Sequence, residues 1–285
     1  MAITILNPKM TEPAAAASRA GLCALVVMAK APRPGSVKTR LSPPLKPEQA
    51  TLLSVSFLRD TTESLATVAA MPGCAAAGVV AYTPAGDEAL FNELLPEGFA
   101  LLAQRGEGFG ERLLAAVEDI LACGYGSVCL VDSDSPTVPP AAYRQAVSEL
   151  ARPGDRIVLG AAADGGYYLI GMTQAHATVF EGIEWSTETV AAHTREQARR
   201  GGIEVVELPL WYDVDDGASL EILKAELLAG IAPGFVTVPG YGAPRTKAKL
   251  MEMEVGIDSA KGLALDAGGA ADAAVDEQET PGGFD

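Results

Sequence analysis

The chain has 285 residues, of which 48% are hydrophobic and 6% aromatic, and its formal net charge is −16. This length allows one large domain or two small ones, and the negative charge argues against nucleic acid or an anionic membrane surface as a partner. No apolar run reaches the roughly 18 residues that a membrane-spanning helix needs. The 4 cysteines show no CxxC pairing and there are only 2 histidines, so we expect reduced thiols, no zinc site and a cytoplasmic location.

The sequence pattern changes twice along the chain. Residues 1–20 lack an apolar period and are expected to form a flexible N-terminal arm. Residues 22–31 imitate the apolar part of a signal peptide, but little positive charge precedes them, so we expect a strand there. Strand and helix patterns then alternate through a single domain over residues 21–243. Beyond it the pattern fades into Gly, Ala and acids, which predicts an acidic disordered tail over residues 244–285.

The order of the expected elements defines the fold class. Alternation at this spacing is typical of βαβ crossovers and predicts an α/β fold, with a mostly parallel mixed sheet and helices on both faces. The expected strands are 22–29, 77–82, 99–103, 127–131, 156–160, 167–171 and 203–208. The expected helices are 47–70, 87–95, 110–123, 139–151, 186–200 and 217–229.

A basic loop follows the first expected strand. Lys30, Arg33, Lys38 and Arg40 lie in a segment that prolines and Gly35 keep irregular. Phosphate groups explain four cations after a buried strand of an acidic protein, because Lys and Arg neutralise them while loop N–H groups hold the oxygens. The segment has no GxxxxGK[ST] pattern, so it is not a Walker loop. A solvated basic turn is the alternative.

Acidic residues follow two of the expected strands. Asp132 and Asp134 come directly after an apolar strand. Ligands bind at the carboxyl edge of an open α/β sheet, and two carboxylates there favour a hard divalent ion that bridges nucleotide phosphates. Asp213, Asp215 and Asp216 form a second acidic junction before a helix, and the two junctions are expected to meet across a shared ion. The alternative is that these acids cap the following helices, with Asp216 as the cap of the second.

Two further segments contain residues suited to a ligand pocket. Gln104, Gly106 and Gly108 lie between a strand and a helix. The glycines permit close approach of the backbone to a flat group such as a base or a ribose, and a flexible linker is the alternative. Trp185 offers a pocket wall, and one of the hydroxyls at residues 186–187 is expected to cap the next helix.

Asp164 precedes two glycines and an aromatic strand. Gly165 and Gly166 suit a tight turn that leaves Asp164 facing the cleft. Because side chains alternate along a strand, one of Tyr167 and Tyr168 is expected to line the cleft and the other to enter the core. A plain hairpin turn is the alternative.

Six separated motifs together are similar to a known family. They are AKAPRPGSVKTRLS, QRGEGFGERL, VDSDSPTVP, ADGGYYLIG, IEWST and WYDVDD, in this order within residues 22–230. In them the chain resembles the DUF2064 family of bacterial glycosyltransferase-like proteins. The resemblance implies a single Rossmann-like domain of the GT-A, nucleotide-diphospho-sugar transferase fold. GSVKTRLSPPL is also similar to the N-terminal loop of the 2-phospholactate guanylyltransferases, and VDDGASL to the VDTPEDL ending of cytidylyltransferases that activate acidic sugars.

The resemblance implies a set of site residues. Asp134 and Asp215 match the acids that hold magnesium in those relatives, so we expect them to bind Mg²⁺ or Mn²⁺. Lys38 and Arg40 are expected to neutralise the diphosphate, and Asp164 to orient or deprotonate an acceptor hydroxyl. The predicted nucleotide-binding residues are Lys30, Arg33, Gly35, Lys38, Arg40, Gln104, Gly106, Gly108 and Asp132. The predicted acceptor or sugar pocket consists of Gly165, Gly166, Tyr167 and Trp185.

These roles predict a metal-dependent glycosyltransferase that transfers a sugar from a nucleotide-diphospho-sugar to a small-molecule acceptor. The alternative is a nucleotidyltransferase that joins an NTP to a phosphorylated or acidic small molecule and releases pyrophosphate. The basic loop favours the alternative, because an NTP carries more negative charge than a nucleotide-sugar. A nucleotide-binding module without turnover is a third hypothesis, and the intact pair of acidic junctions argues against it.

Overall fold

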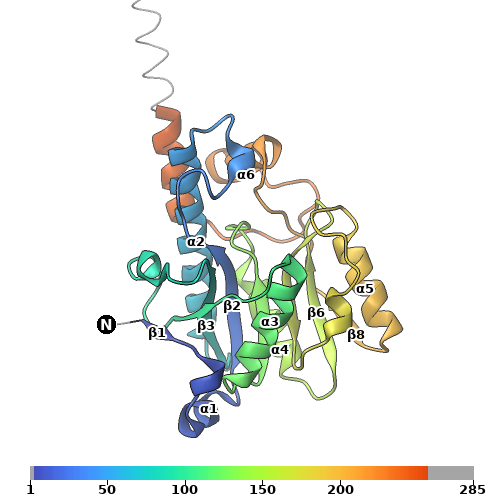
Figure 1. Cartoon of the computed structure of the whole chain (residues 1–285). Coiled ribbons are helices and arrows are strands. Elements are labelled where there is room, and N and C mark those ends of the chain that lie inside the picture. Colours follow the sequence, from blue (N-terminus) through green and yellow to red (C-terminus); the bar gives the residue numbers. More distant parts are fainter. Residues whose placement is uncertain (1–2, 256–285) are drawn as a thin grey trace, which may run out of the picture.

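An eight-stranded sheet with helices on both faces forms the body of the molecule (Figure 1). The structure, a computed structural model, describes residues 3–255. The strands are β1 (Thr4–Ile5), β2 (Cys23–Lys30), β3 (Ala76–Thr83), β4 (Ala100–Ala103), β5 (Ser127–Val131), β6 (Arg156–Ala161), β7 (Tyr167–Met172) and β8 (Glu204–Glu207), in the spatial order β1-β4-β3-β2-β5-β7-β6-β8. All neighbours pair in parallel except β7, which is antiparallel to both β5 and β6. The predicted α/β class with a mostly parallel mixed sheet is confirmed.

The helices occupy most of the connections between strands. They are α1 (Pro13–Arg19), α2 (Pro47–Ala69), α3 (Phe109–Ala122), α4 (Pro140–Leu150), α5 (Val190–Arg200) and α6 (Gly217–Ala229), together with the 3₁₀ turns η1 (Pro8–Met10), η2 (Thr39–Leu41), η3 (Glu88–Phe91) and η4 (Ala177–Phe180). Residues 244–255 form a further helix. Within residues 3–255, no helix combines the length and the apolar character that crossing a membrane requires.

Burial on both faces explains why the central strands are apolar throughout. β2 pairs in parallel with β3 and β5, and all of it but Met28 and Lys30 is buried. Its odd-numbered side chains pack in one layer with α2, α4 and α6, and its even-numbered side chains pack in the other with α3 and α5. The carboxyl ends of the parallel strands therefore open on one edge of the sheet, between the helix layers.

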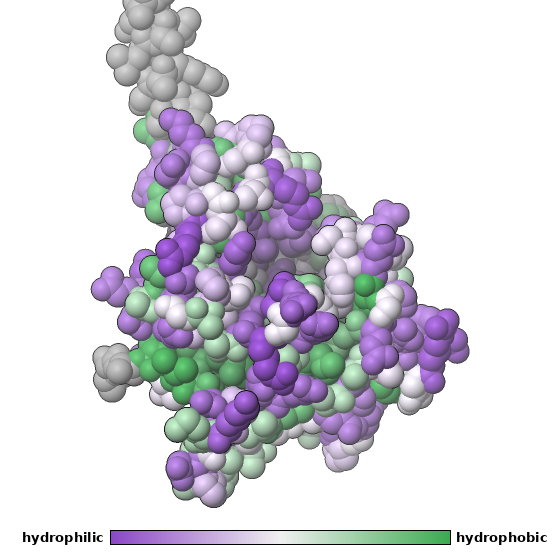
Figure 2. Space-filling view, viewed as in Figure 1, coloured by the Kyte–Doolittle hydropathy of each residue, from purple (hydrophilic) through white to green (hydrophobic). Residues whose placement is uncertain are grey.

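The expectation that residues 1–20 form a flexible arm is wrong for most of that segment. β1 adds to the sheet edge in parallel with β4, and Leu6 donates its N–H to the carbonyl of Leu101 at 2.7 Å. After α1, Arg19 donates to the carbonyl oxygen of Cys123 at 3.1 Å. These are pairings with distant segments, so no local period in the sequence announces them. Figure 2 shows a hydrophobic area beside the N-terminal end of the chain.

The helix expected at residues 87–95 is also wrong, since only the single turn η3 forms there. A short helix needs an apolar face that packs on the core, because propensity alone does not stabilise it. Phe91 is fully buried, but Leu90 is 39% exposed, and Leu94 and Leu95 are only partly buried. The apolar residues of this segment thus supply one anchor instead of a continuous stripe.

The domain boundary expected at residue 244 lies too early. Helix 244–255 runs beside α2 (Figure 1), with Leu250 1% exposed and Thr246 fully buried. Asp60 on α2 accepts the N–H groups of Arg245 at 3.1 Å and Thr246 at 2.7 Å, so a buried carboxylate satisfies the first turn of this helix. The rest of the predicted tail, residues 256–285, lies outside the described residues.

Replacement of Asp60 tests this attachment. Asp60→Ala is expected to lower the free energy of unfolding by about 2 kcal/mol, because two charge-assisted hydrogen bonds are lost and the buried N–H of Thr246 remains unpaired. Chemical denaturation gives this value, and hydrogen exchange locates the loss in helix 244–255. Glu63→Ala is the control, since Glu63 makes an exposed ion pair with Arg245 and its loss is expected to cost less than about 1 kcal/mol. Equal effects of the two substitutions would contradict the assignment.

Candidate functional site

The two acidic junctions of the chain meet at the carboxyl edge of the sheet. One follows β5 and the other precedes α6, and the N–H of Val214 donates to the carbonyl oxygen of Asp134 at 3.0 Å. This backbone hydrogen bond fixes Asp134 beside Asp215, although 80 positions separate Val214 from Asp134. The predicted proximity of the two junctions is therefore what the structure has.

The ammonium group of Lys38 lies between the two carboxylates. Its Nζ is 2.8 Å from Oδ1 of Asp134, 2.9 Å from Oδ1 of Asp215 and 2.7 Å from the carbonyl oxygen of Val214. The Lys38 side chain is 5% exposed, whereas the two acids are about one third exposed. Burial lowers the pKa of Lys38, but the charges of Asp134 and Asp215 outweigh burial and hold it above its usual value. The site thus contains a buried, ionised lysine shared by two acids.

More cations surround the same position. Arg40 pairs with Oδ2 of Asp215 and is 69% exposed. A pocket of about 250 Å³ opens here. Its lining includes Lys30, whose ammonium group has no partner among the described residues, together with Lys38, Arg40, Asp134 and Asp215. Three cations and two acids in one pocket suit a ligand that carries phosphate groups and a divalent ion.

Two further acids lie beside this pocket in poorly solvated positions. Asp132 accepts a hydrogen bond from Oγ of Ser135 at 2.7 Å, but its Oδ1 is buried and has no partner among the described residues. Burial, then the charge of Asp134, raises the pKa of Asp132 well above its usual range. Burial, then the charges of Asp164 and Asp215, raises the pKa of Asp213 to about 7. The site therefore holds more acid than its cations neutralise.

Asp213 belongs to the predicted second acidic junction, but no role of its own in the site was predicted for it. Its alternation with Asp215 in the WYDVDD motif was visible, because residues two apart in an extended segment face the same side. The motif does not indicate that Asp213 is largely buried and lies near Asp164.

The turn at Asp164 has the tight geometry that its glycines suggest. Oδ1 of Asp164 accepts the N–H of Gly166 at 2.8 Å, and the exposed Asp164 lies close enough to Asp213 to raise its pKa. Gly165 has φ +92°, and a Cβ there would lie 2.0 Å from the carbonyl oxygen of Glu188. Only glycine therefore allows the segment before α5 to pack on this turn.

The aromatic residues of the predicted acceptor pocket, Tyr167 and Trp185, pack together against the core layer that contains α3 and α5. The ring of Trp185 lies 5.0 Å from that of Phe109 and 6.5 Å from that of Tyr167, both edge to face. The Tyr167 hydroxyl is buried, and Tyr168 enters the opposite core layer and donates to the carbonyl of Pro209. The expectation that one of the two tyrosines lines the cleft is not met at the 250 Å³ pocket, whose lining includes neither.

The cap expected for the helix after Trp185 is wrong. α5 begins at Val190, its N-cap residue is Thr189, and no side chain caps it. Ser186 has φ +65°, which lies outside helical geometry. The hydroxyl of Thr187 instead donates to the carbonyl of Glu184 at 2.7 Å. In contrast, Asp216 does cap α6, because it accepts the N–H of Ser219 at 2.8 Å.

Several predicted nucleotide-binding residues do not line the pocket. Arg33 makes two hydrogen bonds to Asp87, of 2.9 and 2.6 Å, and Gly35 forms a turn with φ +75°. Gln104 donates to the carbonyl oxygens of Ala81 at 2.7 Å and Ala29 at 3.4 Å, which joins the ends of β2 and β3.

The glycine loop that begins at Gly106 is also occupied by the protein itself. Gly108 is the N-cap residue of α3, and Glu111 accepts the N–H groups of Glu107 at 2.9 Å and Gly108 at 3.3 Å. A carboxylate of the chain therefore already binds the N-terminal end of this helix.

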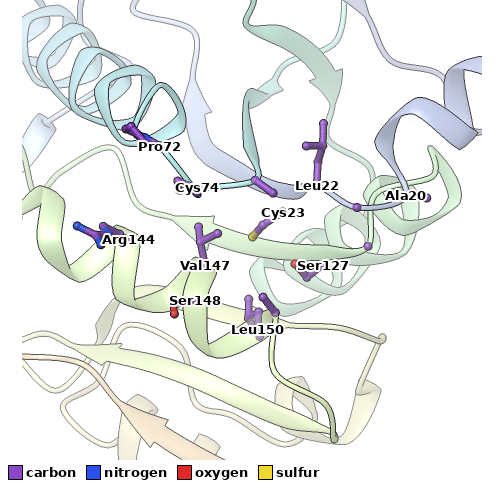
Figure 3. A pocket seen from close by; sticks show the side chains of 15 residues that line it. Ala20, Leu22, Cys23, Pro72, Cys74, Ser127, Arg144, Val147, Ser148 and Leu150 are labelled. Carbon is purple, nitrogen blue, oxygen red and sulfur yellow. The ribbon is translucent and has the colours of Figure 1, made fainter.

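A second pocket lies at the opposite, amino-terminal edge of the sheet. It measures about 530 Å³, and its lining includes Cys23, Cys74 and Arg144 (Figure 3). No carboxylate and none of the predicted site residues line it. We therefore place the candidate site at the smaller pocket, where the charged groups converge.

The two carboxylates at that pocket suit Mg²⁺ or Mn²⁺ if water and the phosphates of a substrate supply the remaining ligands. Within residues 3–255 no group of three or more His, Cys, Asp or Glu side chains has the arrangement to hold a metal ion. Two carboxylates are nevertheless enough for Mg²⁺, which is usually bound by one or two protein acids, waters and the phosphates of the substrate. The position between Asp134 and Asp215 already accommodates a positive charge, that of Lys38.

The fold, with its acidic site at the carboxyl edge of the sheet, is that of the nucleotide-diphospho-sugar transferases. A crystal structure of a provisionally assigned nucleotide-diphospho-sugar transferase from Desulfovibrio desulfuricans G20 is 30% identical, covers 82% of this chain and 95% of its own, and superposes with a TM-score of 0.68. The family model "Uncharacterized protein conserved in bacteria (DUF2064)" matches residues 64–187. The chain belongs to the DUF2064 family.

More distant structures align over much of the chain at lower similarity. CMP:2-keto-3-deoxy-manno-octonic acid synthetase complexed with CTP is 14% identical, with a TM-score of 0.47, and covers 74% of this chain and 100% of its own. The inositol-1-phosphate CTP transferase from T. maritima is 16% identical, with a TM-score of 0.44, and covers 77% and 100%. Similarity at this level does not bear on activity. No curated protein matches the chain.

Proposed function

We propose that this protein is a metal-dependent glycosyltransferase, which transfers a sugar from a nucleotide-diphospho-sugar to a small-molecule acceptor. The observation that carries the proposal is the pocket in which Asp134 and Asp215 share Lys38, with Lys30 and Arg40 at its rim. The 30% identical relative, aligned over 95% of its length, supports the sugar donor. The reduced state of the 4 cysteines, all free, supports a cytoplasmic location.

In this proposal the acids and cations divide the work. Asp134 and Asp215 hold Mg²⁺ or Mn²⁺, which supplies Lewis-acid neutralisation of the diphosphate leaving group. Lys38, Arg40 and Lys30 bind the phosphate oxygens and stabilise the negative charge that develops on the diphosphate as its bond to the sugar breaks and the acceptor oxygen bonds to the sugar.

The acceptor is proposed to bind beside Asp164, away from the cations that bind the diphosphate. Asp164 is exposed on the turn between β6 and β7 and orients or deprotonates the acceptor hydroxyl. Gly165 and Gly166 leave no side chain at this turn, where a Cβ would contact Glu188 or Asp164. Tyr167 and Trp185 pack beside it in the neighbouring core layer. The base or the ribose is proposed to bind beside the loop of Gln104, Gly106 and Gly108, outside the 250 Å³ pocket, where Glu111 already accepts the N–H groups of Glu107 and Gly108.

A nucleotidyltransferase is the second candidate, and one observation favours it. Three cations line a pocket of only about 250 Å³, a density that suits the triphosphate of an NTP as well as the diphosphate of a nucleotide-sugar. In that reaction the same metal and cations would neutralise pyrophosphate as the leaving group.

Thermal melting with a panel of ligands separates the candidates without knowledge of the acceptor. NTPs and nucleotide-sugars are each added with Mn²⁺ and with EDTA. A ligand at about 100 times its dissociation constant stabilises the fold by about 2.7 kcal/mol, which is readily measured. We expect Mn²⁺-dependent stabilisation by one nucleotide-sugar. Stabilisation by an NTP alone would favour the second candidate, and no metal-dependent shift with any ligand would overturn both.

A further inference from the structure

Lys38 takes the oxygens that a metal ion would need. Of the four carboxylate oxygens of Asp134 and Asp215, Lys38 binds Oδ1 of each and Arg40 binds Oδ2 of Asp215. Only Oδ2 of Asp134 makes no hydrogen bond or ion pair in the described part of the chain. With the carbonyl of Val214 as its third acceptor at 2.7 Å, all three ammonium hydrogens of Lys38 are matched.

A metal ion and the Lys38 ammonium cannot both bind these carboxylate oxygens without strong mutual repulsion. Mg²⁺ binds carboxylate oxygens at about 2.0–2.1 Å. An ammonium group within 2.8 and 2.9 Å of the same two acids would then lie next to a doubly charged ion, in a position where its side chain is 5% exposed and water screens little. Either the metal is excluded or Lys38 moves.

A destination for the displaced ammonium lies in the same pocket. Its lining continues from Lys38 to Lys30, Ser36, Arg40 and Ser54, which present cations and hydroxyl groups and no further acid. A phosphate group bound there would accept the ammonium that leaves the carboxylates. The lysine side chain permits this exchange, because its ammonium group is carried on a flexible four-carbon stem.

We propose that Lys38 is an exchangeable internal counter-ion: a divalent cation displaces its ammonium from Asp134 and Asp215, and the ammonium then binds the phosphate of the donor. Metal and phosphate therefore bind with positive coupling, and the free protein binds metal weakly. This inference rests on the proposed function, since it concerns the same metal and the same phosphate. It makes Lys38 a competitor of the metal in the free protein and a ligand of the donor phosphate once the metal is bound.

The test measures metal affinity directly, on the full chain freed of metal. Mn²⁺ is titrated and free Mn²⁺ is followed by electron paramagnetic resonance. Lys38→Met is expected to bind Mn²⁺ at least about 10-fold more tightly than the wild type, because no ammonium competes. Lys30→Met is the matched control: it removes one positive charge from the same pocket but frees no carboxylate oxygen, so a change of about threefold or less is expected. Lys38→Gln serves in the same way if the Met variant does not fold.

A second measurement uses inorganic phosphate as the probe, with a protein-free titration subtracted. Phosphate is expected to tighten Mn²⁺ binding to the wild type more than to Lys38→Met, in which only direct contact of the ion with phosphate couples the two. Equal Mn²⁺ affinity in the wild type, Lys38→Met and Lys38→Gln would overturn the exchange while leaving the proposed function intact. An equal gain in Lys30→Met would reduce the effect to net charge and also overturn it. If no variant binds Mn²⁺, with or without phosphate, the metal dependence of the proposed function falls as well.

Discussion

Asp134→Asn is expected to fold normally and to lose at least about 100-fold in metal-dependent turnover of the nucleotide-sugar donor. The amide has the size of the carboxylate but no charge, so it cannot complete an anionic pair with Asp215 around a divalent ion. Neutralisation of the leaving group is worth several kcal/mol, and about 3 kcal/mol corresponds to this loss of rate. The fold is expected to survive, because Asp134 is about one third exposed and Lys38 keeps Asp215 and the Val214 carbonyl as partners.

The neighbouring acid Asp216 supplies a matched control. Asp216→Asn makes the same change of charge one residue from Asp215, but Asp216 caps α6 and asparagine caps equally well. We expect its turnover to stay within a factor of about two of the wild type, by analogy with surface substitutions. Rates are measured with the donor that the melting panel identifies, at saturating Mn²⁺. Turnover of Asp134→Asn close to that of Asp216→Asn would show that Asp134 holds no metal in the reaction.

Local pattern was sufficient for most of the sheet and its helices. The apolar run before Asp132 became β5, and the helix expected at 47–70 is α2 (Pro47–Ala69). Both signals are local, because burial on two faces forces an unbroken apolar strand and a helix must repeat its buried face every turn. β1 and helix 244–255 were missed, since β4 and Asp60, the partners that stabilise them, are far away in the sequence.

The candidate site divides in the same way. Topology explains why Asp134 and Asp215 lie together, because both acidic junctions lie at the carboxyl edge of one sheet. That Lys38 lies between them does not follow, since a lysine in a loop of cations reads equally well as a ligand of phosphate. Its place depends on the left-handed backbone at φ 50° and on the Val214 carbonyl, which only the folded chain supplies. Burial of Asp213 is likewise a property of the packed loops.

The stability of the ligand-free protein is expected to fall as the pH rises from about 5 to 8. Burial raises the pKa of Asp213 to about 7, well above its value of 3.8 in the unfolded chain, and the pKa of Asp132 is raised as well. Between these values the folded protein holds protons that the unfolded chain has released. The unfolded state then binds fewer protons, so the contribution of these two acids to the free energy of unfolding decreases with rising pH across this window.

Asp213→Asn removes the contribution of Asp213 to this pH dependence. Since the amide does not ionise, the variant is expected to be more stable than the wild type at pH 8, by about 3 kcal/mol once solvent screening of a partly buried group is allowed for. For a domain of this size that corresponds to roughly 6–12 °C in melting temperature. At pH 4 the two proteins are expected to melt together.

Melting curves recorded at intervals from pH 4 to 8.5 without metal or nucleotide measure this difference, with Asp87→Asn as the control. Arg33 holds the pKa of Asp87 below its usual value, so above about pH 5 Asp87 is ionised in both the folded and the unfolded chain, and its replacement is expected to leave the slope between about pH 5 and 8.5 unchanged. Parallel curves for the wild type and Asp213→Asn would exclude a buried, protonated Asp213. Curves that converge at low pH and separate at high pH would mean that the acids of the site lower the stability of the ligand-free protein, because they outnumber its cations. A bound divalent ion is expected to relieve this cost.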